Sequence, residues 1–181
     1  MSTRRGAHYL KVTLVLVVLA AVPAALLSVP PAVLVVEEHD TGKILFHKGM
    51  KINETFTLAY IHSITKQPVH EVFYVKDSRT LALKEMRYDS FGSNLPVGPE
   101  KLAQETTEFY VEDGFYKIIY ENRTFDRVPV MVGQVVADHA LVFTDESRLR
   151  FLDVTEGGTY IDFYVKPFLN FLINRISLLY F

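Results

Sequence analysis

Residues 60–75, YIHSITKQPVHEVFYV, contain two runs of alternating apolar residues separated by a short polar turn. Alternation with a period of two is typical of a half-buried β-strand, because successive side chains point to opposite faces of a sheet. The stretch therefore predicts a β-hairpin. It also places His62, Ser63, His70 and Glu71 beside the turn, where they are candidates for a reactive site.

The register of this hairpin decides which side chains meet. If Tyr60 pairs with Phe73, the large apolar side chains share one face, and a slip of one residue would move them to the other face. That favoured register gives a single apolar face made of Phe56, Leu58, Tyr60, Phe73 and Val75.

In this register the polar side chains form two pairs on opposite faces. His62 is expected to face Glu71 on the core side, with Cβ atoms about 5 Å apart, and Ser63 is expected to face His70. A serine hydrolase needs its nucleophile, base and carboxylate in one line, so a triad is disfavoured. A zinc site from His62, Glu71 and His139 is also disfavoured, because these residues lack a tight ligand spacing. We interpret His62 and Glu71 as a structural pair at the end of the core, with a ligand-binding pair as the alternative.

The composition excludes several classes of function. The chain has 181 residues and no cysteine, so disulfides, thiolate metal sites and thiol nucleophiles are not available. Its net charge is -2, and because Arg4, Arg5 and Lys11 lie in the first segment, the remainder carries -5. An acidic body lacks the basic surface that nucleic acids require. No cofactor is predicted.

Residues 1–31 are expected to form a transmembrane anchor. Basic residues precede an uncharged apolar run over 12–27, which with its extension to Val29 is about 20 residues long, enough to span a bilayer. Basic flanks stay on the cytoplasmic side, so the N-terminus is expected in the cytoplasm and the following domain on the outer face of the cell membrane. Cleavage as a signal peptide near Val22-Pro23-Ala24 is the alternative, although it would leave an apolar new terminus.

Residues 32–156 are expected to form an extracytoplasmic β domain. Pro30-Pro31 ends the apolar helix, and short β-rich runs such as TFTLAYIHS, FYKIIYEN and FDRVPVMV then alternate with turn residues. Strands at this spacing indicate an antiparallel β-sandwich or a barrel-like domain. No amphipathic helix of ordinary length interrupts them, so a parallel sheet is disfavoured.

Residues 157–181 are expected to form a C-terminal strand and a short apolar helix. Pro167 suits the first helical position, and the helix from Phe168 onward, about 14 residues and roughly 21 Å, is too short to cross a bilayer. Its apolar face is wider than a helix on one sheet needs. Two interpretations stay open: a helix in the membrane interface or on a membrane protein, and a helix that covers an open end of the sandwich.

A second candidate for ligand binding is the stretch YDSFGSNLPVGP, residues 88–99. Gly92 and Asn94 tolerate left-handed backbone conformations, and consecutive amides in such a turn can hold an anion. Ser90 and Ser93 add hydroxyl donors, although a surface turn shaped by glycine and proline is the simpler interpretation. The candidate ligand-binding residues are therefore Tyr60, His62, Glu71, Ser90, Gly92, Ser93 and Asn94.

These residues carry a resemblance to a known family. The combination of Tyr60-Ile61-His62-Ser63, Pro68, Glu71, Ser90-Phe91-Gly92 and Leu95-Pro96 resembles the signature of an uncharacterised family of small extracytoplasmic domains. The resemblance spans roughly residues 33–154 and departs at Ser93-Asn94, where the family tends to have smaller residues. Members of that family are often encoded beside TAXI-type TRAP transporters, which take up organic acids.

The resemblance implies an accessory of a membrane transport system on the outer face of the membrane. Its implied partners are the membrane, the transporter's membrane subunit or solute-binding protein, and a small organic anion. We therefore expect a membrane-anchored binding or accessory module that acts without covalent chemistry. The alternatives are a hydrolase-like enzyme with His62 as general base assisted by Glu71, and a structural envelope protein. An enzyme needs His62 beside an accessible pocket, whereas a scaffold can bury it.

Overall fold

The computed structural model describes residues 29–93, 95–99, 101–102 and 105–177. Residues 31–181 form one compact unit, and the chain before them forms another. The anchor expected over 1–31 falls on residues 1–28, which lie outside the described part of the chain. Among the residues that are described, no helix has the length and apolar character needed to cross a membrane.

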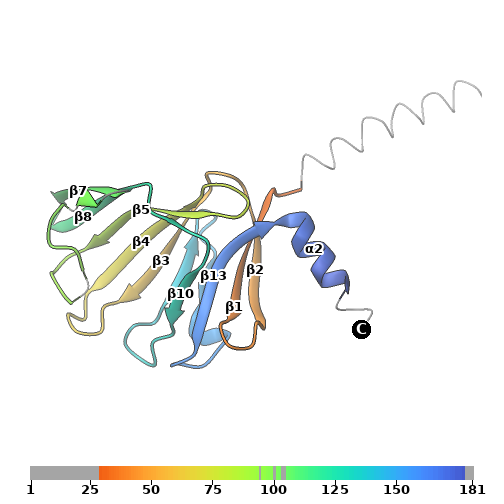
Figure 1. Cartoon of the computed structure of the whole chain (residues 1–181). Coiled ribbons are helices and arrows are strands. Elements are labelled where there is room, and N and C mark those ends of the chain that lie inside the picture. The colour runs from red at the N-terminus through yellow and green to blue at the C-terminus, as the bar shows by residue number, and fades with distance from the viewer. Residues whose placement is uncertain (1–28, 94, 100, 103–104, 178–181) are drawn as a thin grey trace, which may run out of the picture. The chain divides into compact units, whose positions relative to one another are not determined.

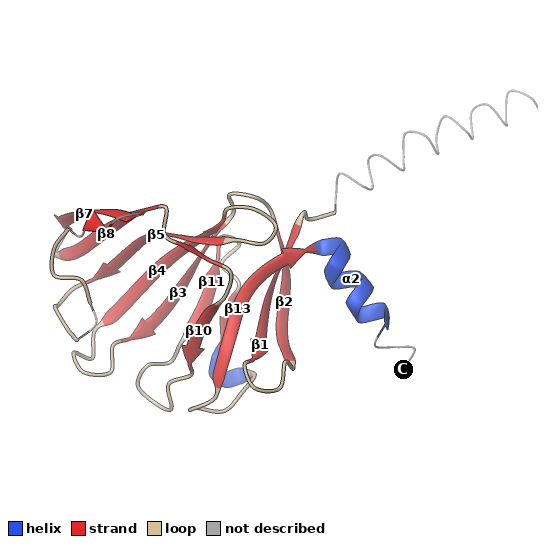
Figure 2. Ribbon diagram, in the orientation of Figure 1, coloured by secondary structure: helices blue, strands red, loops and turns tan. Residues whose placement is uncertain are grey.

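The described unit consists of two antiparallel β-sheets and a short C-terminal helix (Figure 1, Figure 2). The four-stranded sheet contains, in spatial order, β10 (Val128–Met131), β13 (Tyr160–Pro167), β1 (Ala32–Glu38) and β2 (Ile44–Met50). All its pairings are antiparallel. The predicted all-β antiparallel architecture is therefore confirmed.

The second sheet is wider and carries the hairpin that dominates the sequence pattern. Its nine strands are, in spatial order, β12 (Arg148–Arg150), β11 (Ala140–Phe143), β3 (Thr55–Ile61), β4 (Pro68–Val75), β5 (Leu81–Tyr88), β8 (Phe115–Glu121), β7 (Glu105–Glu112) and β6 (Lys101–Leu102), with β9 (Thr124–Phe125) paired to β5. A single 3-10 turn, η1 (Phe151–Asp153), follows β12. Figure 1 shows β7 and β8 at the side of the unit that is farthest from the C-terminal helix.

The core lies between the inner faces of the two sheets. Phe163 of the four-stranded sheet meets Phe73 and Phe56 of the nine-stranded sheet edge-on, with ring centroids 5.3 Å and 5.9 Å apart. Edge-to-face contacts of this kind suit the quadrupoles of aromatic rings. All three rings are almost completely buried. The alternating positions of β3, β4 and β13 thus supply the hydrophobic core, as the period of two requires.

Strand β1 is buried on both faces, which explains its uninterrupted apolar sequence AVLVV. Leu34 and Val36 point into the core between the sheets. Val33 and Val35 point outward and are covered by Phe171 of the C-terminal helix. A strand without a solvated face has no reason to alternate apolar and polar residues.

The C-terminal residues are part of the same compact unit. Strand β13 lies between β10 and β1 and pairs with β1 over seven residues, from Pro167 opposite Ala32 to Ile161 opposite Glu38. The short helix that follows, α2 (Phe168–Ser177), confirms the expected C-terminal helix, and residues 178–181 lie outside the described part of the chain. Its contacts are with β13 and β1, so it packs on the outer face of the four-stranded sheet.

Candidate functional site

The β3–β4 hairpin forms, but in a different register from the predicted one. Phe56 pairs with Phe73, Leu58 with Glu71 and Tyr60 with Val69. The predicted pairing of Tyr60 with Phe73 is therefore wrong by four residues. Because the displacement is an even number, each side chain stays on its predicted face.

The displacement arises because the loop covers residues 62–67, two residues earlier in the chain than the loop over 64–69 that the predicted register leaves. The His62 N–H donates to the Gln67 carbonyl at 2.8 Å, and Lys66 adopts a left-handed φ of 60°. The loop therefore takes up six residues, and the strands begin to pair only at Ile61 and Pro68.

The two expected polar pairs are not present in this register. Glu71 accepts a hydrogen bond from the Tyr60 hydroxyl at 3.1 Å, and it lies opposite Leu58. Ser63 is exposed in the loop, and His70 lies opposite Ala59. The prediction that His62 faces Glu71 is therefore wrong, because the loop carries His62 beyond the end of the paired strands.

His62 instead forms hydrogen bonds that connect two loops. Its Nδ1 accepts a hydrogen bond from the Thr65 backbone N–H at 3.2 Å, and its Nε2 lies 2.9 Å from the Ser93 carbonyl oxygen. Since a carbonyl only accepts, Nε2 carries the proton, and the ring is the neutral Nε2–H tautomer. The side chain is only 8% exposed. Both nitrogens are thus used to hold the 62–67 loop and the 89–96 loop against each other.

Gly92 is required for this contact because of its size. A Cβ at this position would lie 2.8 Å from His62 Cε1 and 2.9 Å from Thr65 Cγ2, closer than side chains approach. Its φ is not in the left-handed region, which among the described glycines is occupied by Gly42, Gly114 and Gly158. The expectation that Gly92 supplies left-handed geometry is therefore wrong. Asn94, the other residue expected to do so, lies outside the described residues.

The rest of the 89–96 loop is held by aromatic side chains. The Tyr88 hydroxyl donates to the Pro96 carbonyl, and burial raises the pKa of Tyr88 to about 12, so the hydroxyl keeps its proton. Phe91 stacks on Tyr116 with ring centroids 4.1 Å apart. Ser90 donates its hydroxyl to Asp89 at 2.9 Å. The loop is thus shaped by contacts within the domain.

A pocket of about 300 Å³ opens where these loops meet. Three separate parts of the chain line it, namely Tyr60, Ile61, His62 and Ser63 of the hairpin, Ser93 and Leu95 of the following loop, and Met131, Gly133, Ala137 and His139. Three of the candidate residues, Tyr60, His62 and Ser93, are on its wall. Glu71, Ser90 and Gly92 do not line the pocket. Glu71 bonds to the lining residue Tyr60 and Gly92 lies against the lining residue His62, whereas Ser90 bonds only to Asp89.

His139 also lines the pocket, although the sequence analysis considered it only as a possible zinc ligand. Its Nδ1 accepts the Gly133 N–H at 3.1 Å, and its ring lies 5.1 Å from the ring of Tyr60. Burial lowers the pKa of His139, although Asp138 acts in the opposite direction. The neutral ring therefore keeps a proton on Nε2, which is a hydrogen-bond donor on the pocket wall. The sequence does not predict this role of His139, because the contact with Gly133 depends on the conformation of the segment 132–139.

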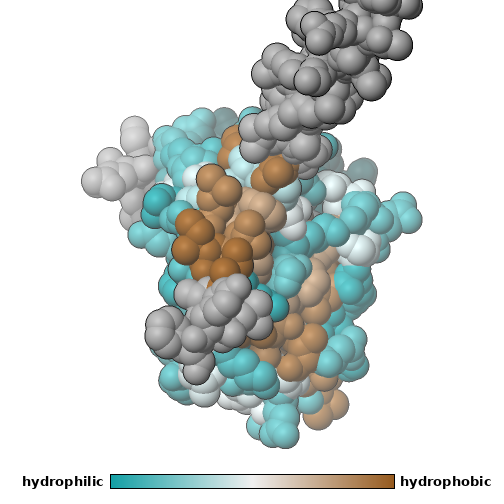
Figure 3. All heavy atoms as spheres, turned by 90° about the vertical axis from the view of Figure 1, so that its right-hand side faces the viewer, coloured by the Kyte–Doolittle hydropathy of each residue, from teal (hydrophilic) through white to brown (hydrophobic). Residues whose placement is uncertain are grey.

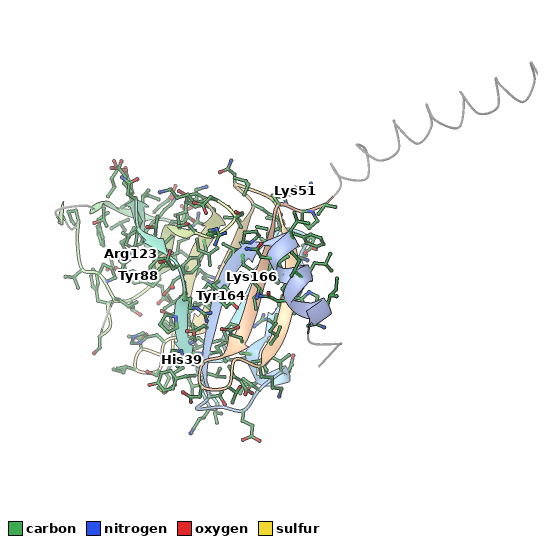
Figure 4. All side chains as sticks on the ribbon, turned by 45° about the vertical axis from the view of Figure 1, so that its right-hand side comes forward. His39, Lys51, Tyr88, Arg123, Tyr164 and Lys166 are labelled. Carbon is green, nitrogen blue, oxygen red and sulfur yellow. The ribbon has the colours of Figure 1, made fainter. Side chains whose placement is uncertain are left out.

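At the wall of the pocket, Tyr60 and Glu71 form a half-buried polar pair. Burial raises the pKa of Glu71, while the Tyr60 hydrogen bond and the charge of Arg123 act in the opposite direction. Burial and the neighbouring Glu71 also raise the pKa of Tyr60. Figure 4 shows Arg123 and Tyr88 on the side of the unit away from Lys166. Within the described chain, no group of three His, Asp or Glu side chains is arranged to hold a metal ion.

A larger hollow of about 440 Å³ lies on the outer face of the nine-stranded sheet. Its polar groups are engaged with one another: Glu85 is 2.7 Å from Arg87 and 3.8 Å from Lys117. Burial and Arg87 lower the pKa of His70, which also lines it. The smaller pocket is the better candidate, because the residues singled out by the sequence converge on it and not on this hollow.

The comparison with known proteins adds a family but no activity. No characterised protein and no solved structure matches the chain significantly. A family model described as a domain of unknown function, DUF1850, matches residues 56–149, which is just over half of the 181 residues. The match contains the hairpin, the 89–96 loop and the second wall of the pocket, and it leaves out β1, β2, β13 and α2. The chain therefore belongs to the DUF1850 family of domains of unknown function.

Proposed function

We propose that this protein is a membrane-anchored, extracytoplasmic module that binds a small molecule in the pocket at the end of the β3–β4 hairpin, as an accessory of a TRAP-type organic-acid transporter. The pocket carries the proposal. Its wall is assembled from three separate segments of the chain, and His62, Gly92 and Tyr88 hold that assembly in place. A concave site with a few convergent polar groups is what small-molecule binding requires.

The chemistry of the wall favours binding over covalent catalysis. A general base needs a free nitrogen within reach of its substrate. Both nitrogens of His62 are engaged by backbone groups, and Glu71 is directed to Tyr60. The groups left for a ligand are the Nε2–H of His139 and the hydroxyls of Ser63 and Ser93.

These groups also limit the kind of ligand. The lining residues include donors but neither lysine nor arginine. Burying a carboxylate without a cation costs free energy unless several donors satisfy it. A small solute that offers one carboxylate or carbonyl group to these donors fits better than a multiply charged anion. The N-terminal sequence supports the proposed location on the outer face of the membrane. The family resemblance supports the proposed association with a transporter.

Two measurements test the proposal. Affinity purification of the full chain from membranes, followed by identification of co-purifying proteins, should recover subunits of a solute transporter. In parallel, NMR spectra should be recorded with acetate, succinate and glutamate as probes. We expect acetate to give larger shifts at residues 60–63 and at His139 than the doubly charged succinate. Ser93→Tyr should abolish these shifts, because the larger side chain fills part of the pocket.

A matched control separates pocket filling from a general effect of the loop. Val97 directly follows the 89–96 loop, is 74% exposed and does not line the pocket, so Val97→Tyr should leave ligand shifts unchanged. Equal losses in both variants would contradict binding at this pocket. Recovery of the protein without any transporter subunit would contradict the transporter association. The NMR result would still decide whether the pocket binds a ligand.

A further inference from the structure

Helix α2 uses only part of its surface to contact its own domain. Phe171 is 7% exposed and packs on Val33, Val35 and Tyr164 of the four-stranded sheet. Phe168, about one turn earlier, is partly buried against the same cluster. The side of α2 that carries these two phenylalanines is therefore the side that covers the sheet.

A second side of α2 is apolar and exposed. Leu169, Leu172, Ile173 and Ile176 are 66%, 43%, 63% and 46% exposed. At about 100° per residue these four side chains fall within one arc of about 100°, next to the phenylalanines. Figure 3 shows hydrophobic atoms gathered on the face of the unit to which α2 belongs. Four large aliphatic side chains in one arc form a patch, whereas single exposed residues of this kind are ordinary.

The third side of α2 is polar, and the helix carries no acidic residue. Asn170 and Asn174 form this side, opposite the boundary between the aliphatic arc and the phenylalanines. Arg175, in the last turn, lies on the phenylalanine side, with its guanidinium carbon 5.8 Å from the centre of the Phe171 ring. Lys166, directly before the helix, places its Nζ 5.4 Å from the Phe171 ring. Aliphatic residues on one side with basic residues beside them are typical of helices that lie at the surface of an anionic membrane.

The start of α2 lies next to the start of the domain. The Phe168 N–H donates to the Pro31 carbonyl, and Ala32 pairs with Pro167, so α2 begins where the domain begins. The apolar run over 12–27 ends four residues before Pro31, which is at most about 14 Å of extended chain. The ten residues of α2 extend about 15 Å from there. A bilayer spanned by the anchor is therefore within reach of the whole helix.

We propose that α2 lies in the lipid–water interface of the membrane, with Leu169, Leu172, Ile173 and Ile176 among the acyl chains. The inference rests on the proposed anchoring by residues 1–31. The helix would give the domain a second attachment and a fixed orientation, because one flexible junction at Pro30-Pro31 leaves the domain free to turn. The phenylalanine side of α2 stays on the sheet, so the helix does not have to unfold or detach in order to insert.

The absence of cysteine allows a direct test with single labels. Ile173→Cys, Asn170→Cys and Val111→Cys are introduced one at a time into the full chain, which is labelled with an environment-sensitive fluorophore and reconstituted into liposomes of phosphatidylcholine and phosphatidylglycerol. Val111 is 68% exposed on β7, far from α2, and serves as the control in water. We expect nitroxide-labelled lipid to quench the label at Ile173 at least about threefold more than the labels at Asn170 and Val111, because an interfacial helix buries only its apolar side.

Two other outcomes of the quenching experiment overturn the inference. Equal quenching of the labels at Ile173 and Asn170 by aqueous iodide would mean that α2 lies in water. A label at Ile173 that is shielded from both iodide and lipid nitroxide would mean that a second copy or another protein covers the helix. Carbonate extraction of the same liposomes tests the anchor separately. If the chain resists carbonate extraction but the label at Ile173 lies in water, only the interfacial helix is refuted. If carbonate extracts the chain but the label at Ile173 lies in lipid, only the anchor is refuted.

Discussion

The two halves of the β3–β4 hairpin use the same alternating pattern for different purposes. In the half near Phe56 and Phe73, the inward side chains are aromatic and meet Phe163 of the opposite sheet. In the half near Tyr60, the inward side chains include Tyr60 and Glu71, which bond to each other, and His62 follows at the end. The first half is stabilised by buried hydrocarbon.

The second half is stabilised by specific hydrogen bonds, and it is where the chain forms a pocket. A hydrogen bond requires a defined partner at a defined distance, whereas apolar packing tolerates adjustment. The main role of the polar half is therefore to fix the positions of the neighbouring loops, and its contribution to the free energy of unfolding is smaller than that of the aromatic half. The difference between the halves leads to four predictions.

The largest effect is expected in the aromatic half. Phe73→Ala should lower the free energy of unfolding by about 3–5 kcal/mol, because it leaves a cavity between Phe56 and Phe163. Urea denaturation measures this loss. Phe115→Ala is the control, since Phe115 is 40% exposed, and it should change stability by less than about 1 kcal/mol. Similar losses for both variants would contradict the assignment of Phe73 to the centre of the core.

Gly92→Ala tests the close contact in the polar half. The added Cβ would lie 2.8 Å from His62 Cε1, so the loop has to move away and stability should fall by about 1–3 kcal/mol. A Cβ at Gly98, two residues beyond the 89–96 loop, would meet no atom within 4 Å, so Gly98→Ala is the matched control. If both variants unfold at the same urea concentration, the packing of Gly92 against His62 is not as described.

His62→Ala removes the acceptor of the Thr65 N–H and the donor to the Ser93 carbonyl. We expect a loss of about 1–3 kcal/mol, together with changed NMR shifts in both loops. Because His62 and Glu71 share no hydrogen bond, combining His62→Ala with Glu71→Ala should give the sum of the single effects to within about 0.5 kcal/mol. A loss of stability in the double variant that is much smaller than this sum would mean that His62 and Glu71 do interact directly.

The smallest effect concerns the charge of Glu71. Its raised pKa means that the folded state binds a proton more tightly than the unfolded state, so Glu71 lowers stability as the pH rises from its ordinary value through the raised one. Below that window both states are protonated and the penalty disappears. Glu71→Gln keeps an acceptor for Tyr60 without the charge, and its stability relative to wild type should increase between pH 4 and pH 7, by about 1.4 kcal/mol for each unit of pKa shift.

Urea midpoints at several pH values measure this difference. Glu121→Gln, in which the lost carboxylate is exposed on β8, controls for the removal of a negative charge. A constant difference between Glu71→Gln and wild type across this range would show that Glu71 is solvated in the folded protein.

The sequence by itself determined the class of fold and the face on which each hairpin residue lies. Alternation with a period of two specifies inward and outward positions, and it survived the four-residue error in register because that error was even. The same pattern carries no information about displacement along the strand. The apolar and turn residues likewise predicted an antiparallel β domain and a short C-terminal helix, because they depend on local geometry and burial.

Only the tertiary structure decided the partners of the polar side chains. His62 bonds to Ser93, which is 31 residues away in the chain, and His139 joins the same pocket from beyond β10. Such contacts follow from how loops of particular lengths return to one end of two packed sheets, and a loop placed two residues earlier in the chain was enough to move His62 away from Glu71. The pairing of β13 with β1, which brings α2 to the start of the domain, is likewise a long-range event. Local sequence patterns encode burial, whereas the distance between remote residues is fixed only when the whole core has packed.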